Sequence, residues 1–474
     1  MRLSSSPSDD SGGEGQSGRL FGPLFADPGV ERELSDAAML GAMLEVESTL
    51  ASVQADLGII PVDAAEAIAK ACRAGAFDVG EIGRQADASG NPVVPLVKAI
   101  GAQLPADAAG WLHRGATSQD VLDTALMLTA RRAVRVLRAH LRVGADVAFE
   151  LSTAHRDSVM VARTLGQQAA PTTFGLKAAG WLVALDAAQA GLATADDALA
   201  VQFGGAVGNL GALGEPGLAV LAGLATALGL AEPTMPWHTD RGRVLGLAAA
   251  LGSACAALGK IGLDVVLLAQ SEVGEVSEGA GGGGGLADSA DSAGSAGRGG
   301  SSAMPHKHNP VDAILVRSAA MRAPGLVSTL LLTSQQEHER GAGGWHGEWL
   351  PLRELLSVTG GAASRTRRML AGMEVHADRM RANLEATGGR LMAEHAAAAL
   401  APALGRAAAH DVVARCLARG GNLRDVLLAD DEVRAHLEPE QLDDLLAPRR
   451  ALAAVGPLID RALAAHRALP DAGS

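Results

Sequence analysis

Five long stretches of this 474-residue sequence repeat apolar residues every three to four positions and contain few helix breakers. They are residues 121–155, 176–201, 241–277, 310–336 and 350–369. This period is typical of an α-helix with one buried face, so the stretches predict five long helices that pack as a bundle. Aromatic residues make up only 2% of the chain and tyrosine is absent, which predicts an aliphatic core. The predicted fold class is all-α.

The pattern of apolar residues and helix breakers changes on both sides of these stretches. Before them, short apolar segments alternate with turn signals, and after them glycine and proline breaks return. The extreme N-terminus is rich in Ser, Gly and Asp and lacks an apolar core, so it is neither a signal peptide nor an anchor. We therefore predict a disordered tail, an N-terminal helical domain, a central long-helix bundle and a C-terminal helical domain, at residues 1–18, 19–112, 113–370 and 371–474.

The net charge and the cysteine content limit which kinds of binding partner and which cellular compartment we expect. A net charge of −13 argues against nucleic acid as a partner, so local cations must hold any anionic substrate. Apolar segments such as 261–270 are flanked by charge and fall short of the ~20 residues that span a bilayer, so we expect no membrane contact. Cys72, Cys255 and Cys416 fit neither a metal site nor a disulfide framework. They predict buried thiols in a cytoplasmic protein.

The most specific motif lies in a predicted loop over residues 279–309. Residues 300–310 read Gly-Ser-Ser-Ala-Met-Pro-His-Lys-His-Asn-Pro. Asn309 and the proline after it are typical of a helix start, whose positive end, with Lys307, would stabilise an anion or a deprotonated serine. The alternative is a Gly/Ser linker, which the residues upstream resemble, but a linker does not need this polar pattern.

This motif is similar to the signature of the fumarase/aspartase superfamily, whose members add or eliminate across the carbon beside a carboxylate. The resemblance runs from about residue 20 to past residue 390. It implies a homotetramer in which the long helices form one central bundle and three subunits build each active site. It further implies that Ser301 is the catalytic base, that Lys307 and Asn309 hold a carboxylate and stabilise an enolate-like intermediate, and that Ser302 and Met304 help to bind substrate.

A second motif, residues 113–120, reads His-Arg-Gly-Ala-Thr-Ser-Gln-Asp and comes directly before the first long stretch. Its hydroxyls and carboxylate are good helix caps, so a plain helix start is one interpretation. In the superfamily, however, the matching segment binds a substrate carboxylate. The resemblance therefore implies substrate contacts from Thr117, Ser118 and Gln119.

A third segment, residues 163–175, is predicted to be a polar turn between two long helices. In several superfamily members the residue after its Arg-Thr is a histidine that serves as, or helps, the general acid. Here that residue is Leu165. A leaving hydroxide, amine or guanidine benefits from protonation, whereas a carboxylate leaves as a stable anion. Leu165 therefore indicates a leaving group that is already acidic.

One branch of the superfamily fits this departure, the 3-carboxy-cis,cis-muconate cycloisomerases. They close a tricarboxylate diene into 4-carboxymuconolactone during protocatechuate breakdown by the β-ketoadipate pathway. Residues 90–97 and 336–349 resemble this branch in particular, although the second run could also be a solvated charged loop. The resemblance implies a small tricarboxylate substrate that Gln168, His338 and Arg340 help to bind.

Three other functions remain open from the sequence. The first is adenylosuccinate lyase or another fumarate-releasing lyase of the superfamily, since the serine motif is shared, but Leu165 and Asn91 argue against adenylosuccinate lyase. An inactive scaffold is disfavoured because Ser301, Lys307 and Asn309 are intact. A cation-binding bundle lacks facing Glu and His residues. We expect no cofactor and no metal, since the reaction has no redox step and no His/Asp/Glu cluster has ligand spacing.

Overall fold

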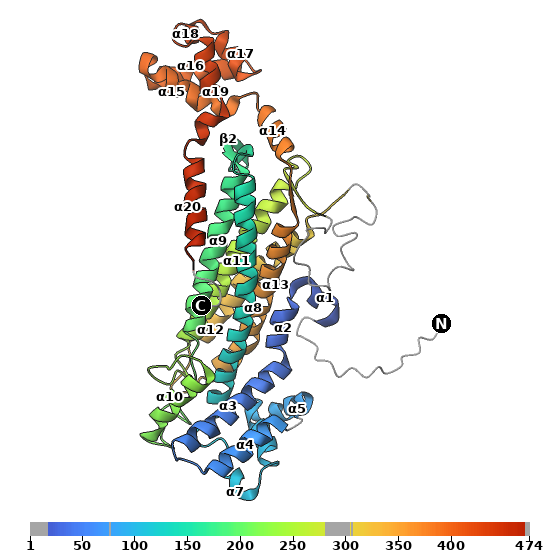
Figure 1. Ribbon diagram of the computed structural model, residues 1–474, viewed down its shortest axis with the longest axis vertical. Coiled ribbons are helices and arrows are strands. Elements are labelled where there is room, and N and C mark those ends of the chain that lie inside the picture. Colours follow the sequence, from blue (N-terminus) through green and yellow to red (C-terminus); the bar gives the residue numbers. More distant parts are fainter. Residues whose placement is uncertain (1–17, 75–76, 280–303, 305–306, 470–474) are drawn as a thin grey trace, which may run out of the picture. The chain divides into compact units, whose positions relative to one another are not determined.

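The computed structural model describes residues 18–74, 77–279, 304 and 307–469, and these are mostly helical (Figure 1). Two compact units are distinguished. Unit 1 comprises residues 1–140, 188–259 and 315–364, and unit 2 comprises residues 141–187, 260–314 and 365–474. The predicted N-terminal tail lies outside the described residues up to residue 17. The division into three domains stays a prediction.

All five predicted long helices are present. They are α8 (Ser118–Ala154), α9 (Phe174–Asp197), α11 (Gly242–Leu268), α12 (Val311–Thr333) and α13 (Gly344–Ala371). The prediction for residues 241–277 runs nine residues too far, because α11 ends at Leu268 and a turn with Gly274 at a φ of 60° leads into a short strand. Apolar periodicity continues through that turn, so the pattern alone did not mark the helix end.

Unit 1 also holds the short helices predicted near the N-terminus. They are α1 (Gly18–Phe25), α2 (Pro28–Leu34), α3 (Asp36–Asp56), α4 (Val62–Ala74), α5 (Val79–Ser89), α6 (Val93–Gly101) and α7 (Ala106–Ala109). A further short helix of unit 1, α10 (Pro216–Leu228), was not predicted. Their starts follow the capping chemistry: the Ser35 hydroxyl accepts the N–H of Ala38, and the Asp78 carboxylate accepts the N–H of Glu81. Helix α3 packs against α4 and α10.

Unit 2 contains a feature that the sequence analysis missed. Residues 163–175 are not a simple polar turn, because they belong to an antiparallel hairpin of β1 (Val159–Thr164) and β2 (Gln167–Thr173). Leu165 and Gly166 form its tip with φ values of 50° and 79°, the left-handed geometry of a tight hairpin turn. The second sheet pairs β3 (Val276–Glu278) with β4 (Met373–Val375).

The C-terminal part of unit 2 is a cluster of short helices. They are α14 (Ala377–Glu385), η2 (Arg390–Met392), α15 (Ala393–Leu404), α16 (Arg406–Ala418), α17 (Leu423–Leu428), α18 (Asp431–Arg434), α19 (Pro439–Leu446), η3 (Pro448–Leu452) and α20 (Val455–Arg467). Leu400, Val412 and Leu427 are completely or almost completely buried in their shared aliphatic core. Helix α15 packs on α16 and α19, and α16 also contacts α17.

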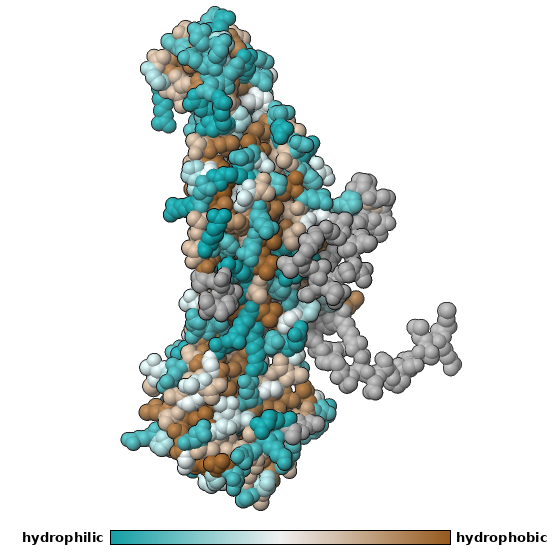
Figure 2. Space-filling model, viewed as in Figure 1, coloured by the Kyte–Doolittle hydropathy of each residue, from teal (hydrophilic) through white to brown (hydrophobic). Residues whose placement is uncertain are grey.

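Several apolar side chains of α11 and α12 remain exposed on the single chain. They are Leu263, Leu267, Ile314, Met321, Leu331 and Leu332. On the face drawn in Figure 2, apolar residues interrupt the hydrophilic surface in the same way. Contrary to the sequence-based expectation, α11 and α12 are long and apolar enough by composition to cross a bilayer, a test that core helices of soluble proteins also pass.

The three cysteines are free and buried, as predicted. Burial raises the pKa of Cys72 to about 12 and that of Cys255 to about 11. Their thiols are therefore uncharged and unreactive at neutral pH.

Candidate active site

The start of α8 gathers several predicted site residues in unit 1. Ser118 is the first residue of the helix, and the Asp120 carboxylate turns back to accept the N–H of Thr117 at 3.0 Å. The same carboxylate accepts the N–H groups of Gly204 and Gly205, at 3.0 and 2.9 Å. The segment thus serves as a helix start and leaves the side chains of Thr117 and Ser118 partly exposed.

Arg340 reaches this turn from the loop between α12 and α13. Its Nη1 donates to the Thr117 hydroxyl at 2.6 Å and to the carbonyl oxygen of Ala206 at 3.4 Å. His338 lies two residues earlier, exposed, with a φ of 48°. The structure therefore brings together the predicted contacts Thr117, Ser118 and Arg340, and a guanidinium beside hydroxyls is an arrangement that binds carboxylates.

Gln119 behaves differently from its two neighbours. Its side chain is buried, and Nε2 donates to the Asp123 carboxylate at 3.2 Å and to the backbone oxygen of His238 at 2.9 Å. These bonds fix the first turn of α8 from inside unit 1. The predicted contact of Gln119 with substrate stays a prediction.

A buried ion network underlies this turn. Arg241 lies between Asp123 and Glu348, with N···O distances of 2.8 and 2.9 Å, and all three side chains are about 1% exposed. Burial acts to lower the pKa of Arg241, but the two carboxylates outweigh it and raise that pKa. Burial also raises the pKa of Glu348, against the opposing charge of Arg241. Trp345 adds an indole N–H to Asp123 at 2.9 Å.

The sequence analysis missed this network. Glu348 belongs to the run 336–349, which was open to interpretation as a solvated loop. The run has an exposed part and a buried part: Glu337 and Glu339 are exposed, whereas Trp345 and Glu348 are buried. The available signal was the helical spacing of Trp345, Glu348 and Leu352, which marks one inward face of α13.

His113 is a second residue that sequence reasoning quoted but did not select. Its Nδ1 lies 2.6 Å from the buried Glu47 carboxylate, and its φ of 57° is rare for a residue with a side chain. Burial acts to lower the pKa of His113, but the hydrogen bond and charge of Glu47 outweigh it and raise that pKa. The raised pKa favours the charged form of this imidazole, which lies three residues before Ala116 in the same segment.

Part of the predicted serine loop is described, in unit 2. Met304 and Lys307 are exposed, Asn309 is half-buried, and the backbone N–H of Lys307 donates to the Met304 carbonyl at 3.0 Å. Ser301 and Ser302 lie outside the described residues. Helix α12 begins at Val311, directly after the predicted Asn-Pro start.

The N-terminal end of α12 differs from the prediction that it is free to bind an anion. The N–H of Val311 donates to the Asn309 carbonyl at 2.9 Å, and those of Asp312 and Ala313 donate to the Glu278 carboxylate at 3.1 and 2.8 Å. Each of these first three N–H groups has a partner, so the predicted anion site at this helix end is wrong. Burial, with Asp312 nearby, raises the pKa of Glu278.

The β1–β2 hairpin carries Gln168, also in unit 2. Gln168 is exposed and pairs in register with Arg163, whose guanidinium binds the buried Glu275 carboxylate at 2.8 Å. Leu165 at the tip has a relative exposure of 102%. An apolar side chain so placed does not pack against the described part of the chain.

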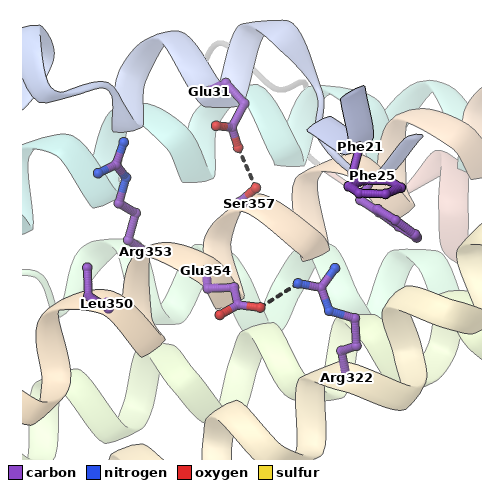
Figure 3. A pocket seen from close by; sticks show the side chains of 8 residues that line it. All are labelled: Phe21, Phe25, Glu31, Arg322, Leu350, Arg353, Glu354 and Ser357. Atoms are coloured by element: carbon purple, nitrogen blue, oxygen red, sulfur yellow. Dashed lines mark hydrogen bonds and ion pairs between the residues drawn. The ribbon is translucent and has the colours of Figure 1, made fainter. Parts of the chain in front are cut away.

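A pocket of about 550 Å³ in unit 1 contains none of these residues. Phe21, Phe25, Glu31, Arg322, Leu350, Arg353, Glu354 and Ser357 line it (Figure 3). Its polar groups serve one another, because Glu31 accepts from Ser357 and Arg322 pairs with Glu354. The pocket is therefore not a candidate active site. Among the described residues, no three His, Cys, Asp or Glu side chains gather as a metal site.

Two family models match the chain. Residues 30–325 match a family described as lyase, and residues 389–462 match one described as adenylosuccinate lyase C-terminus. The first match spans more than half of the sequence. The chain belongs to this lyase family.

Relatives within the lyase family cover almost the whole chain. The nitrosuccinate lyase of Streptomyces davaonensis is 44% identical over 95% of this chain and 96% of its own. The 3-carboxy-cis,cis-muconate cycloisomerase of Pseudomonas aeruginosa is 43% identical over 95% of this chain and 97% of its own. The crystal structure of the 3-carboxy-cis,cis-muconate lactonizing enzyme from Pseudomonas putida superposes with a TM-score of 0.86 at 38% identity, covering 95% and 99% of the two chains.

These similarities confirm three sequence-based predictions about this lyase-family member. The fold class is all-α, the resemblance to the fumarase/aspartase superfamily holds, and the chain is related to the cycloisomerases. The roles of the individual site residues stay predictions.

Proposed function

We propose that the protein is a cycloisomerase that interconverts 3-carboxy-cis,cis-muconate and 4-carboxymuconolactone in protocatechuate breakdown. The similarity to cycloisomerases over nearly the full length supports this reading over adenylosuccinate lyase. Leu165 is the observation that favours it over lyases with a basic leaving group. The residue projects from a hairpin tip, where superfamily members with basic leaving groups place a histidine.

The proposed chemistry needs no acid at that position. In lactonisation, an oxygen of one substrate carboxylate attacks the diene, a C–O bond forms, and a proton is delivered to the carbon beside a second carboxylate. In the reverse direction, a base removes that proton and the C–O electron pair leaves with the carboxylate. Because a carboxylate is a stable anion at neutral pH, its departure needs no proton donor.

Ser301 is the proposed base in the eliminating direction and the proton donor in lactonisation. Its hydroxyl must be made more acidic by Lys307 and by backbone N–H groups of its loop, since Glu278 occupies the α12 end. Lys307 and Asn309 would hold a carboxylate and stabilise the enolate-like intermediate, with Ser302 and Met304 beside the substrate.

The remaining proposed contacts come from the other segments. Arg340, Thr117 and Ser118 supply a cation and two hydroxyls for a second carboxylate, and Arg340 already bonds Thr117. Gln119, Gln168 and His338 complete the proposed set. A tricarboxylate has enough negative charge to satisfy several such contacts, which matches a local cationic group on an acidic protein.

The test is direct. Purified protein is mixed with 3-carboxy-cis,cis-muconate, and loss of the diene's ultraviolet absorbance is followed, with adenylosuccinate in parallel. Rapid loss of the diene alone is expected. Turnover of adenylosuccinate without loss of the diene would overturn the proposal.

A second candidate is release of nitrite from nitrosuccinate. The Streptomyces davaonensis relative is as similar as the cycloisomerases. The reaction removes a proton beside one carboxylate, breaks a C–N bond and leaves fumarate and nitrite. Nitrite is the anion of an acid, so Leu165 fits this leaving group as well. A colorimetric nitrite assay with nitrosuccinate separates the two candidates.

We also propose that the protein is a cytoplasmic homotetramer. The exposed apolar side chains of α12, among them Met321 and Leu332 at 69% and 75% exposure, support burial against other subunits. The three free buried thiols support a reducing compartment. Light scattering should give a mass four times the 47.9 kDa of one chain, and a monomer would contradict the proposal.

A further inference from the structure

We propose that His238 is a positioning residue, which through Asp120 holds the carboxylate-binding turn of α8 and the loop at residues 204–208 in one geometry. The proposal rests on the proposed function, because it assigns the Thr117 turn to a substrate carboxylate. His238 does not touch substrate in this role. It acts on Thr117 through Asp120, which accepts the backbone N–H of Thr117.

The central contact is a buried carboxylate–imidazole pair. Nε2 of His238 lies 2.7 Å from Oδ1 of Asp120, and the two side chains are 3% and 2% exposed. A carboxylate only accepts hydrogen bonds, so Nε2 carries the proton and donates it. The backbone oxygen of His238 also receives the Gln119 amide, which ties the segment before α11 to the first turn of α8.

Asp120 is the junction of this arrangement. Its Oδ1 accepts from His238 and from the N–H of Gly204, and its Oδ2 accepts from the N–H groups of Thr117 and Gly205. Each oxygen thus has two donors from separate segments. Removal of one donor from a buried carboxylate leaves its charge under-compensated, and the three remaining N–H groups must shift to compensate.

The loop is shaped around the imidazole. Gly205 and Gly208 have φ values of 72° and 75°, and a Cβ on Gly204 would come within 3.0 Å of Cε1 of His238. The carbonyl of Ala206, between these glycines, accepts from Arg340, the same guanidinium that bonds Thr117. Arg340 thus bonds the Thr117 turn and the loop at residues 204–208, and the His238–Asp120 pair holds both of these segments in place.

The other ring nitrogen shows why the residue is a histidine. Within the described part of the chain, Nδ1 of His238 is buried and has no hydrogen-bond partner. A buried polar atom without a partner is unfavourable, so packing alone would be served better by an apolar side chain. The hydrogen bond from Nε2 to Asp120 is therefore the reason that residue 238 is a histidine.

The experiment compares His238→Ala with His238→Gln, whose amide N–H can still reach Asp120. For the substrate that the wild type turns over, His238→Ala should raise KM about 10- to 100-fold and lower kcat less, and His238→Gln should restore most of the loss. His466→Gln is the matched control, since His466 is a buried histidine bonded to Asp146 and Asp186 in unit 2. It should leave KM unchanged.

Hydrogen exchange by mass spectrometry provides a readout without substrate. His238→Ala should speed exchange in peptides containing Thr117 and Gly204–Gly205, whereas His466→Gln should not. Unchanged exchange there, or faster exchange with an unchanged KM, would overturn the positioning role. A wild type inactive on both 3-carboxy-cis,cis-muconate and nitrosuccinate overturns the proposed function instead, and the exchange result still decides whether His238 holds the turn.

Discussion

Arg340 donates to the hydroxyl of Thr117 across 2.6 Å, although 223 residues separate them in the chain. This contact joins two segments that the sequence analysis selected independently, the motif before α8 and the charged run before α13. Among the described residues, Nη1 alone of this guanidinium donates hydrogen bonds, so its other N–H groups are available to a ligand.

Substitution of this guanidinium should therefore weaken substrate binding. Arg340→Lys keeps the charge but loses the planar fork, so KM should rise about 10- to 100-fold, the equivalent of one or two charged hydrogen bonds. Steady-state kinetics measures the change, with Arg353→Lys as control, because Arg353 lies on α13 and pairs with Asp36. An unchanged KM would remove Arg340 from the binding site.

Ser301 is the proposed base, and its removal should abolish chemistry without unfolding the protein. Ser301→Ala should lower kcat by about 10²- to 10⁴-fold, the usual contribution of positioned proton transfer. The melting temperature should stay within error of the wild type. Ser292→Ala, in the glycine-rich stretch of the same loop, is the control and should be fully active. Retained turnover in Ser301→Ala would refute the assignment.

Leu165 combines two unfavourable features that one substitution can separate. Its φ of 50° is costly for a branched apolar residue, and its side chain is fully exposed on the single chain. Asn tolerates this φ, so Leu165→Asn should raise the free energy of unfolding of the isolated chain by about 1 kcal/mol. If the leucine covers the leaving group in the assembled site, kcat/KM should fall about 10- to 100-fold.

Chemical denaturation and steady-state kinetics of Leu165→Asn test the two effects separately. A more stable and less active variant is the expected result. A variant with wild-type kcat/KM would show that Leu165 takes no part in the reaction, and the leaving-group argument would lose its structural basis.

The sequence predicted the long helices well because their apolar period is a local property that packing does not override. It missed the β1–β2 hairpin, since Leu165 and Gln168 lie among alternating small and polar residues with no strong period. The overrun of α11 has the opposite origin. Apolar residues continue past Leu268, and the turn is set by the left-handed Gly274 and the buried pair of Glu275 with Arg163.

The candidate site shows the same limit. Motifs identified Thr117 and Arg340, but no local signal shows that Arg340 bonds Thr117 or that Gln119 turns inward. The helix-end prediction for α12 was wrong for a related reason. Capping chemistry placed the start correctly, while the acceptor that occupies its N–H groups, Glu278, comes from a strand more than thirty residues earlier.

The contact of α12 with α13 should make stability pH-dependent through Asp312. Burial acts to raise the pKa of Asp312, but Arg368 and Arg365 outweigh it and lower that pKa. The unfolded chain, with a pKa near 3.9, then binds the proton more readily than the folded chain. The stabilisation is complete above that value and is lost as the pH falls through the folded pKa.

Asp312→Asn tests this assignment. At pH 7 the substitution should lower the free energy of unfolding by about 1.5–3 kcal/mol, since it weakens hydrogen bonds between charged groups. At pH 3 the difference from the wild type should shrink. Urea unfolding at both pH values measures it, with Asp378→Asn on the exposed face of α14 as control. An equal difference at both pH values would contradict the assignment.

The buried network around Arg241 should be the most sensitive point of unit 1. Glu348→Ala removes one of the two buried carboxylates that pair with Arg241 and leaves Asp123 to balance the guanidinium, so it should lower the free energy of unfolding by about 1.5–3 kcal/mol, the loss of hydrogen bonds between charged groups. Glu354→Ala is the matched control on the same helix, because its pair with Arg322 is about 40% exposed and should contribute no more than about 1 kcal/mol.

A double variant separates charge from packing in this network. Arg241→Met together with Glu348→Ala leaves the buried Asp123 carboxylate without a cation, so its free energy of unfolding should fall about 3–5 kcal/mol below that of Glu348→Ala alone, as measured by urea unfolding. Its KM should also rise, because Asp123, which accepts from Gln119 in the first turn of α8, loses the Arg241 guanidinium that holds it. A double variant as stable as Glu348→Ala would show that the buried Asp123 carboxylate does not depend on its cation, and that charge pairing contributes little to this network.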